Sequence, residues 1–143
     1  MATVRRAEAV WEGDLLSGKG RVSAKSSGAF KDQAVSWAAR TETPDGKTSP
    51  EELLAAAHAA CFSMALSHTL GEAGNAPERL EVTATATFVG GTGVTGMKLT
   101  VNGNVPGIDA DAFREAAEGA KDGCPISQAL KGNVPIELKA TLQ

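Results

Sequence analysis

Two cysteines, Cys61 and Cys124, are the residues of this 143-residue chain whose chemistry could be redox. Burial alone is the first explanation to weigh, because free cysteine is among the most buried residue types. In a reducing compartment, a well-separated pair of cysteines otherwise indicates catalysis or metal binding. The segments around the two residues must decide between these explanations.

Cys61 is expected near the middle of a long helix. The run Ser49-Pro50-Glu51-Glu52 combines a cap residue, proline at the first helical position and glutamate three residues after the cap, and the helix should end near Glu72. Cys61 lies too far from that start for the helix dipole to lower its pKa. A thiol with a pKa of about 8.5 is mostly protonated at neutral pH. A cation or donor must therefore activate it, and Arg40 and His58 are candidates.

Cys124 is expected at the start of a short helix. Gly123 precedes it and Pro125 follows it, which places the sulfur where free backbone N–H groups and the helix dipole favour an anion. Such a thiol is suited to attack or to leave. The alternative, a small apolar cap without a redox role, stays open on spacing alone.

The remaining elements follow from apolar periodicity and turn residues. Strands are predicted at residues 3–13, 21–25, 34–40, 79–89 and 134–142. A further strand is predicted through Met97, Leu99 and Val101, after a loop at residues 90–96. Asp109 is predicted to cap a further helix that ends near Lys121. Arg40 would then end the third strand. No repeat or linker interrupts the chain, so a single domain over residues 1–143 is expected.

Composition excludes several classes of function. The net charge is −3 with interspersed charges, so a nucleic acid partner is not expected. Glu8 and Glu12 interrupt the apolar core that a signal peptide needs, and the stretch at 53–70 is rich in alanine and contains two histidines. We therefore expect a cytoplasmic protein without a membrane partner. No short Cys-x-x-Cys or His-x-x-x-His pair indicates a metal site.

Several segments resemble the superfamily of OsmC (osmotically inducible protein C) and organic hydroperoxide resistance proteins. The resemblance spans nearly the whole chain and rests on Trp11-Glu12-Gly13, Ser49-Pro50-Glu51-Glu52-Leu53, Ala56-Ala57-His58-Ala59-Ala60-Cys61-Phe62-Ser63-Met64-Ala65-Leu66 and Gly123-Cys124-Pro125-Ile126-Ser127-Gln128. Within the superfamily, His58 before Cys61 and Ile126 after Cys-Pro are similar to the OsmC branch, because the sister branch usually carries an aromatic residue after Cys-Pro.

The resemblance implies an α+β, OsmC-like fold, with two curved antiparallel sheets around central helices in an intertwined homodimer. It also implies a stress-response peroxidase for organic hydroperoxides, with Cys61 as the peroxidatic thiol and Cys124 as the resolving thiol. Arg40 and Glu51 would hold Cys61 as a thiolate. In the sister branch the arginine comes from nearer the N-terminus, where Arg21 would be its counterpart.

The chemistry that the resemblance implies needs no bound cofactor. Cys61 would become a sulfenic acid, Cys124 would condense with it to a disulfide, and an external dithiol, with a lipoyl protein as one candidate, would reduce the disulfide. Two alternatives stay open: a small-molecule or lipid-binding module on the same fold, and a hydrolase that uses His58 as the base for Cys61. Phe62 and Met64 are expected to contribute to an apolar pocket.

Overall fold

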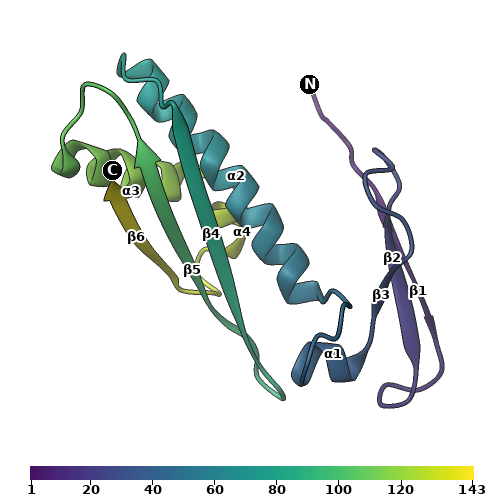
Figure 1. Cartoon of the computed structure of the whole chain (residues 1–143). Coiled ribbons are helices and arrows are strands. Elements are labelled where there is room, and N and C mark those ends of the chain that lie inside the picture. The colour runs from purple at the N-terminus through teal and green to yellow at the C-terminus, as the bar shows by residue number, and fades with distance from the viewer. The chain divides into compact units, whose positions relative to one another are not determined.

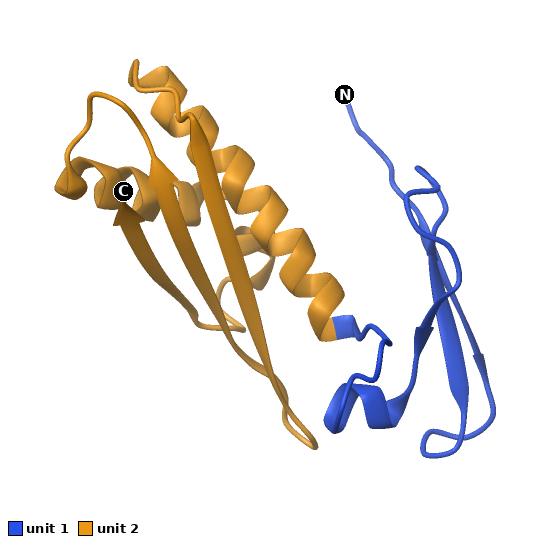
Figure 2. Ribbon diagram, in the orientation of Figure 1, with its two compact units in different colours: residues 1–50 blue, residues 51–143 orange.

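The computed structural model describes residues 1–143, which form two compact units, residues 1–50 and residues 51–143 (Figure 2). Figure 1 labels the elements of both units. The prediction of a single domain stays a prediction, and each unit is described by itself.

The first unit is built on a three-stranded antiparallel sheet. Its strand order is β1 (Ala7–Glu12), β2 (Lys19–Ala24) and β3 (Gln33–Val35), as Figure 1 shows. Trp11 pairs with Gly20 across the first two strands, and a Cβ built on Gly20 would lie 2.6 Å from the Trp11 ring. The glycine therefore makes room for the indole on the sheet.

The strand predicted at residues 34–40 is wrong beyond Val35, because a short helix, α1 (Trp37–Thr41), follows. Ser36 caps this helix: its side-chain oxygen accepts a hydrogen bond from the Ala39 N–H at 3.1 Å. A capping serine followed by two alanines favours a helix. Arg40 consequently lies in the last turn of a helix and not at the end of a strand.

The second unit contains a three-stranded sheet in the order β4 (Arg79–Val89), β5 (Gly93–Asn104) and β6 (Ile136–Leu142). The α+β class is confirmed, but the expectation of purely antiparallel sheets is wrong, because β5 and β6 are parallel. A parallel pair needs a long crossover connection. Here α3 (Ala110–Gly123) and α4 (Pro125–Leu130) form it.

The predicted ends of the long helix and of β4 and the predicted start of α3 are confirmed, and other boundaries shift. The long helix α2 covers Pro50–Glu72 and β4 covers Arg79–Val89, as expected, and the Asp109 side chain accepts from the Ala112 N–H at the start of α3. The loop expected at 90–96 is shorter, because β5 already begins at Gly93.

The core of the second unit lies between α2, α3 and one face of the sheet. Phe62, Leu66 and Leu70 of α2 are fully buried in it. The other buried members come from β5, the loop after it, α3 and the residue that joins α3 to α4: Leu99, Val101, Val105, Phe113, Ala117, Ala120 and Cys124. This packing fixes the middle of α2 against the start of α4.

By length and composition α2 could also cross a membrane, with a mean hydropathy of 1.4 in a window of which 22% is buried. One such helix is weak evidence, since a helix of a soluble protein's core passes the same test. The sequence predicts a helix surrounded by protein, whereas the structure buries one face, through Glu51, His58, Phe62, Leu66 and Leu70.

Gly103 of β5 should be the glycine of this unit that least tolerates a side chain. A Cβ there would lie 2.5 Å from Cζ of the Phe113 ring, so Gly103→Ala should reduce the free energy of unfolding by about 1–3 kcal/mol through overpacking. Gly96 lies in the same strand with open space around its Cα, and Gly96→Ala serves as the control. Equal urea midpoints for the two variants would contradict this account of the core.

Candidate active site

The two cysteines come together although 62 residues separate them in the chain. Cys61 lies in the middle of α2, and Cys124 ends α3 and precedes Pro125 of α4. The two thiols lie close enough that each shifts the pKa of the other, and both residues are free cysteines. The structure therefore brings together the two residues predicted to react with one another.

Cys124 is fully buried but surrounded by donors. Burial alone would raise the pKa of its thiol, yet the pKa lies below its ordinary value because hydrogen bonds outweigh burial. The donors are the Ser127 N–H, the Cys61 thiol, the Ser127 hydroxyl and the Ile126 N–H. The direction of this pKa shift agrees with the sequence-based expectation of an anion-stabilising helix start at Cys124.

For the Cys61 thiol, burial outweighs the groups that lower the pKa. Burial raises the pKa of its thiol, and the hydrogen bond to Cys124 raises it further, while the Ile126 N–H lowers it only in part. Within the pair, the pKa of Cys61 is therefore shifted up and that of Cys124 down. Cys61 is the more accessible of the two, since it is half-buried whereas Cys124 is completely enclosed.

His58 does not act on Cys61. Its Nε2 lies 2.8 Å from Oγ of Ser127 on α4, and its Nδ1 has no hydrogen-bond partner in the protein. Burial also lowers the pKa of the imidazole. The arrangement therefore lacks the Cys61–His58 hydrogen bond that a Cys-His hydrolase needs.

Ser127 is the residue of this cluster that the sequence did not single out. Its position three residues after Cys124 could have indicated a free N–H near the sulfur. Its side-chain partner His58 lies 69 residues earlier in the chain. No local pattern encodes such a contact.

Arg40 lies in the first unit beside aromatic rings. Its guanidinium carbon is 5.7 Å from the centroid of the Trp37 ring, a cation–π distance. An apolar cavity of about 330 Å³ adjoins it, lined by Trp11, Leu15, Val35, Ser36, Trp37, Arg40 and Pro50. An arginine at the wall of an apolar cavity suits a ligand with one polar and one apolar end.

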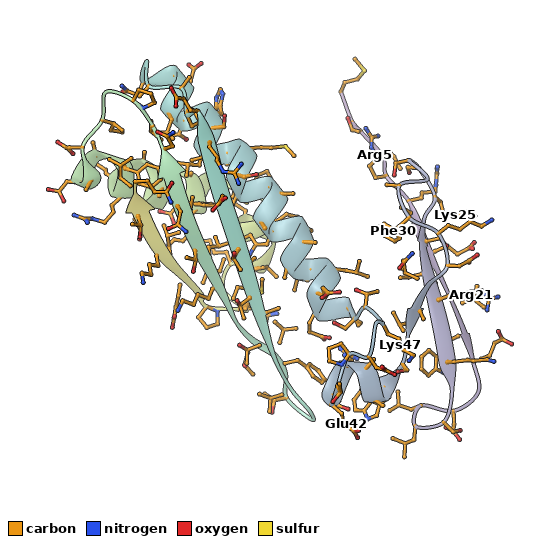
Figure 3. All side chains as sticks on the ribbon, viewed as in Figure 1. Arg5, Arg21, Lys25, Phe30, Glu42 and Lys47 are labelled. Carbon is orange, nitrogen blue, oxygen red and sulfur yellow. The ribbon has the colours of Figure 1, made fainter.

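Arg21 has different surroundings. It is labelled in Figure 3, where its side chain extends from the sheet of the first unit. Its guanidinium lies 3.0 Å from Glu12 and 3.7 Å from Asp32, with about half of its side chain exposed. Arg21 therefore lies beside two carboxylates, one on β1 and one on the residue before β3.

The other predicted residues of the second unit divide between site and core. Glu51 is 8% exposed in the first turn of α2. Phe62 is fully buried in the core and Met64 is 70% exposed, so the expectation that both contribute to one pocket is wrong. Neighbours on a helix that differ by two positions point to different sides. No group of three or more His, Cys, Asp or Glu side chains could hold a metal ion.

Sequence comparisons agree with this arrangement. A model of the family described as OsmC-like protein matches residues 43–139. The chain is 44% identical to Peroxiredoxin OsmC of Escherichia coli (strain K12), over 96% of each chain. It is 33% identical to the organic hydroperoxide resistance protein OhrB of Bacillus subtilis (strain 168), over 64% of this chain and 68% of that protein.

Solved structures show the same fold. An organic hydroperoxide resistance protein from Elizabethkingia anophelis aligns over all of both chains with a TM-score of 0.71 and 25% identity. OhrB of Bacillus subtilis aligns over 96% of this chain and 98% of its own, with a TM-score of 0.65 and 27% identity. Sequence, fold and the paired cysteines lead to one conclusion: this chain belongs to the OsmC family.

Proposed function

We propose that this chain is a thiol-dependent peroxidase that reduces organic hydroperoxides to alcohols. The observation that carries the proposal is the close pair of free cysteines, in which Cys61 is partly accessible and Cys124 is buried, with pKa shifts of opposite direction. A structural role would not require such different surroundings for two thiols in contact. The names of the relatives, a peroxiredoxin and organic hydroperoxide resistance proteins, support the same activity.

The reaction begins at Cys61. Its thiolate attacks the terminal oxygen of ROOH, the O–O bond breaks, and the departing alkoxide takes up a proton to give the alcohol. Cys61 becomes a sulfenic acid. Cys124 thiolate then attacks the Cys61 sulfur, hydroxide leaves and is protonated to water, and a disulfide joins the two residues.

Arg40 supplies the cation that Cys61 needs. Burial and the neighbouring Cys124 raise the pKa of Cys61, so the attacking thiolate requires a positive charge to stabilise it. Arg40 borders an apolar cavity that suits the organic part of a hydroperoxide, whereas Arg21 lies half-exposed beside Glu12 and Asp32. Glu51 orients the guanidinium, a role supported by its burial, since buried carboxylates are normally paired.

The cavity beside Arg40 accommodates the organic part of the hydroperoxide. Two tryptophans form its walls, and each substrate methylene buried there adds roughly 0.8 kcal/mol to binding. Bulky organic hydroperoxides are therefore better substrates than hydrogen peroxide, which has no apolar part.

The enzyme works without a bound cofactor and takes its electrons from an external dithiol, with a lipoyl protein as one candidate. The dithiol attacks the Cys61–Cys124 disulfide, leaves as a disulfide itself and restores both thiols. A reducing cytoplasm suits this cycle. Neither nucleic acid nor membrane takes part.

The active form is a homodimer. All six residues of β1 are exposed, as are Leu15, Leu16 and Met64. A second copy would cover these apolar residues, which a monomer leaves in contact with water.

Replacing each cysteine in turn tests the proposed function. Cys61→Ser should abolish the consumption of cumene hydroperoxide, because serine is not ionised at neutral pH. Cys124→Ser should turn over once without thiol and leave a sulfenic acid that a dimedone-type probe traps. Stopped-flow kinetics with mass spectrometry measures both. A first turnover in Cys61→Ser as fast as in the wild type would exclude Cys61 as the peroxidatic thiol.

Arg40→Met should slow the oxidation of Cys61 by a factor of about a hundred or more, since both the thiolate population and the alignment of the peroxide depend on the cation. Arg21→Met, which removes the same charge from the same unit, should have a far smaller effect. The rate of the first oxidation under single-turnover conditions distinguishes the two variants. If Arg21→Met is the damaging change, Arg21 is the activating arginine.

The urea midpoint of the reduced protein should rise with protein concentration, because dissociation of a dimer is coupled to its unfolding. Sedimentation at micromolar concentration should give a dimer. An active, compact monomer under those conditions would contradict the homodimer.

A further inference from the structure

His58 and Ser127 form a buried polar contact next to the two cysteines. His58 is fully buried in the middle of α2, and Ser127, in the first turn of α4, is 4% exposed. The 2.8 Å between Nε2 and Oγ is a hydrogen bond. The catalytic steps described above use neither side chain, although a buried polar pair is costly unless it is well satisfied.

The direction of this hydrogen bond follows from the other ring nitrogen. Nδ1 of His58 is buried and has no partner in the protein, and orphaned buried N–H groups are rarer than under-satisfied acceptors. The proton of the neutral ring therefore lies on Nε2, and burial, which lowers the pKa of His58, keeps the ring neutral. Nε2–H donates to Oγ of Ser127.

The hydroxyl proton of Ser127 is then available to Cys124. His58 occupies one lone pair of Oγ, and the Ser127 hydroxyl, three residues after Cys124, is among the groups that lower the pKa of Cys124. His58, Ser127 and Cys124 thus connect α2 through α4 to the thiol.

We propose that His58 and Ser127 are positioning residues for the resolving step: His58 Nε2–H orients the Ser127 hydroxyl toward Cys124 and keeps Cys124 ready to attack oxidised Cys61. The inference rests on the proposed peroxidase function and adds residues to it. Cys124 thiolate attacks the sulfur of the Cys61 sulfenic acid, the S–O bond breaks and hydroxide leaves to become water. We call His58 and Ser127 together the relay. The relay stabilises the attacking Cys124 thiolate by hydrogen bonding, and no proton passes through His58.

No charged side chain near Cys124 offers an alternative to the relay as the group that stabilises its thiolate. Cys61 on α2 is the only titratable group among those that shift the pKa of Cys124, and the rest are the N–H groups of α4 and the Ser127 hydroxyl. The charged side chains of α3 and α4 that line a small cavity of about 190 Å³ together with Ser127 are Lys121, Asp122 and Lys131. None of these three is among the groups that shift the pKa of Cys124.

Matched pairs of variants separate the relay from mere packing. Ser127→Ala removes the hydroxyl, whereas Ser127→Thr keeps it. His58→Met removes the donor at nearly constant volume, whereas His58→Gln keeps an N–H near the position of Nε2. Far-UV circular dichroism and urea midpoints establish that each variant is folded, and the serine pair suffices if His58→Met is not.

The kinetic readout follows the two steps separately. After one equivalent of cumene hydroperoxide, the release of alcohol should be unchanged in all four variants, because the first oxidation takes place at Cys61. Disulfide formation, seen as a loss of two mass units, should slow about tenfold or more at pH 7 in Ser127→Ala and His58→Met. The rate of disulfide formation in these two variants should recover as pH rises. A raised pKa of Cys124 leaves less thiolate at pH 7, and the thiolate fraction returns once the pH exceeds the new pKa. Ser127→Thr and His58→Gln should stay near the wild type.

A second readout needs no peroxide, so that its failure is distinguishable from failure of the proposed function. In a Cys61→Ser background, the absorbance of the Cys124 thiolate near 240 nm should titrate at higher pH in Ser127→Ala and His58→Met than in Ser127→Thr and His58→Gln. Unchanged midpoints, or equal slowing of both kinetic steps in every variant, would overturn the relay. A wild-type protein that consumes no hydroperoxide would overturn the peroxidase function alone.

Discussion

The N–H groups at the start of α4 determine what the two sulfurs can do. The Ile126 N–H lowers the pKa of both thiols and the Ser127 N–H lowers that of Cys124, whereas burial raises both. A helix start donates these groups only if it is held against the middle of α2. The core residues of α2, α3 and β5, together with the return of the chain to β6, fix that position.

The two units contribute different kinds of chemistry. The second unit holds the thiols and the donors that distinguish them, and the first holds an arginine at the wall of an apolar cavity. Under the proposed function, the thiol chemistry and the binding of the organic group are thus encoded in separate parts of the chain. Selection on substrate shape can act on the tryptophan-lined cavity without altering the donors around Cys124.

Local signals predicted the elements that position the thiols. Alanine-rich sequence after Ser49-Pro50 defined α2, the alternation from Leu80 to Phe88 defined β4, and glycine and proline around Cys124 defined the start of α4. The pairing of Cys61 with Cys124 came from a family resemblance, because no local pattern encodes contacts across 62 residues.

The predictions that the structure corrects also failed for physical reasons. Val35 and Trp37 suit a strand, but the cap at Ser36 favours a helix, so Arg40 lies in a helix and not in a strand. Alternating apolar and polar residues show which face of β6 is buried, but not whether β6 runs parallel or antiparallel to β5. The crossover through α3 and α4 sets that direction. The contact between His58 and Ser127 depends on tertiary packing alone, and it was therefore invisible until the fold was known.

The long separation of the two cysteines along the chain couples catalysis to folding. A disulfide between residues 61 and 124 closes a large loop of the unfolded chain, which in the chain-entropy description stabilises the oxidised fold by about 4 kcal/mol. The same free energy favours the disulfide in the native state, so a reductant works against it at each cycle. Each molecule would alternate, once per turnover, between a looser reduced form and a more resistant oxidised form, and exposure to hydroperoxide would itself protect the enzyme from unfolding.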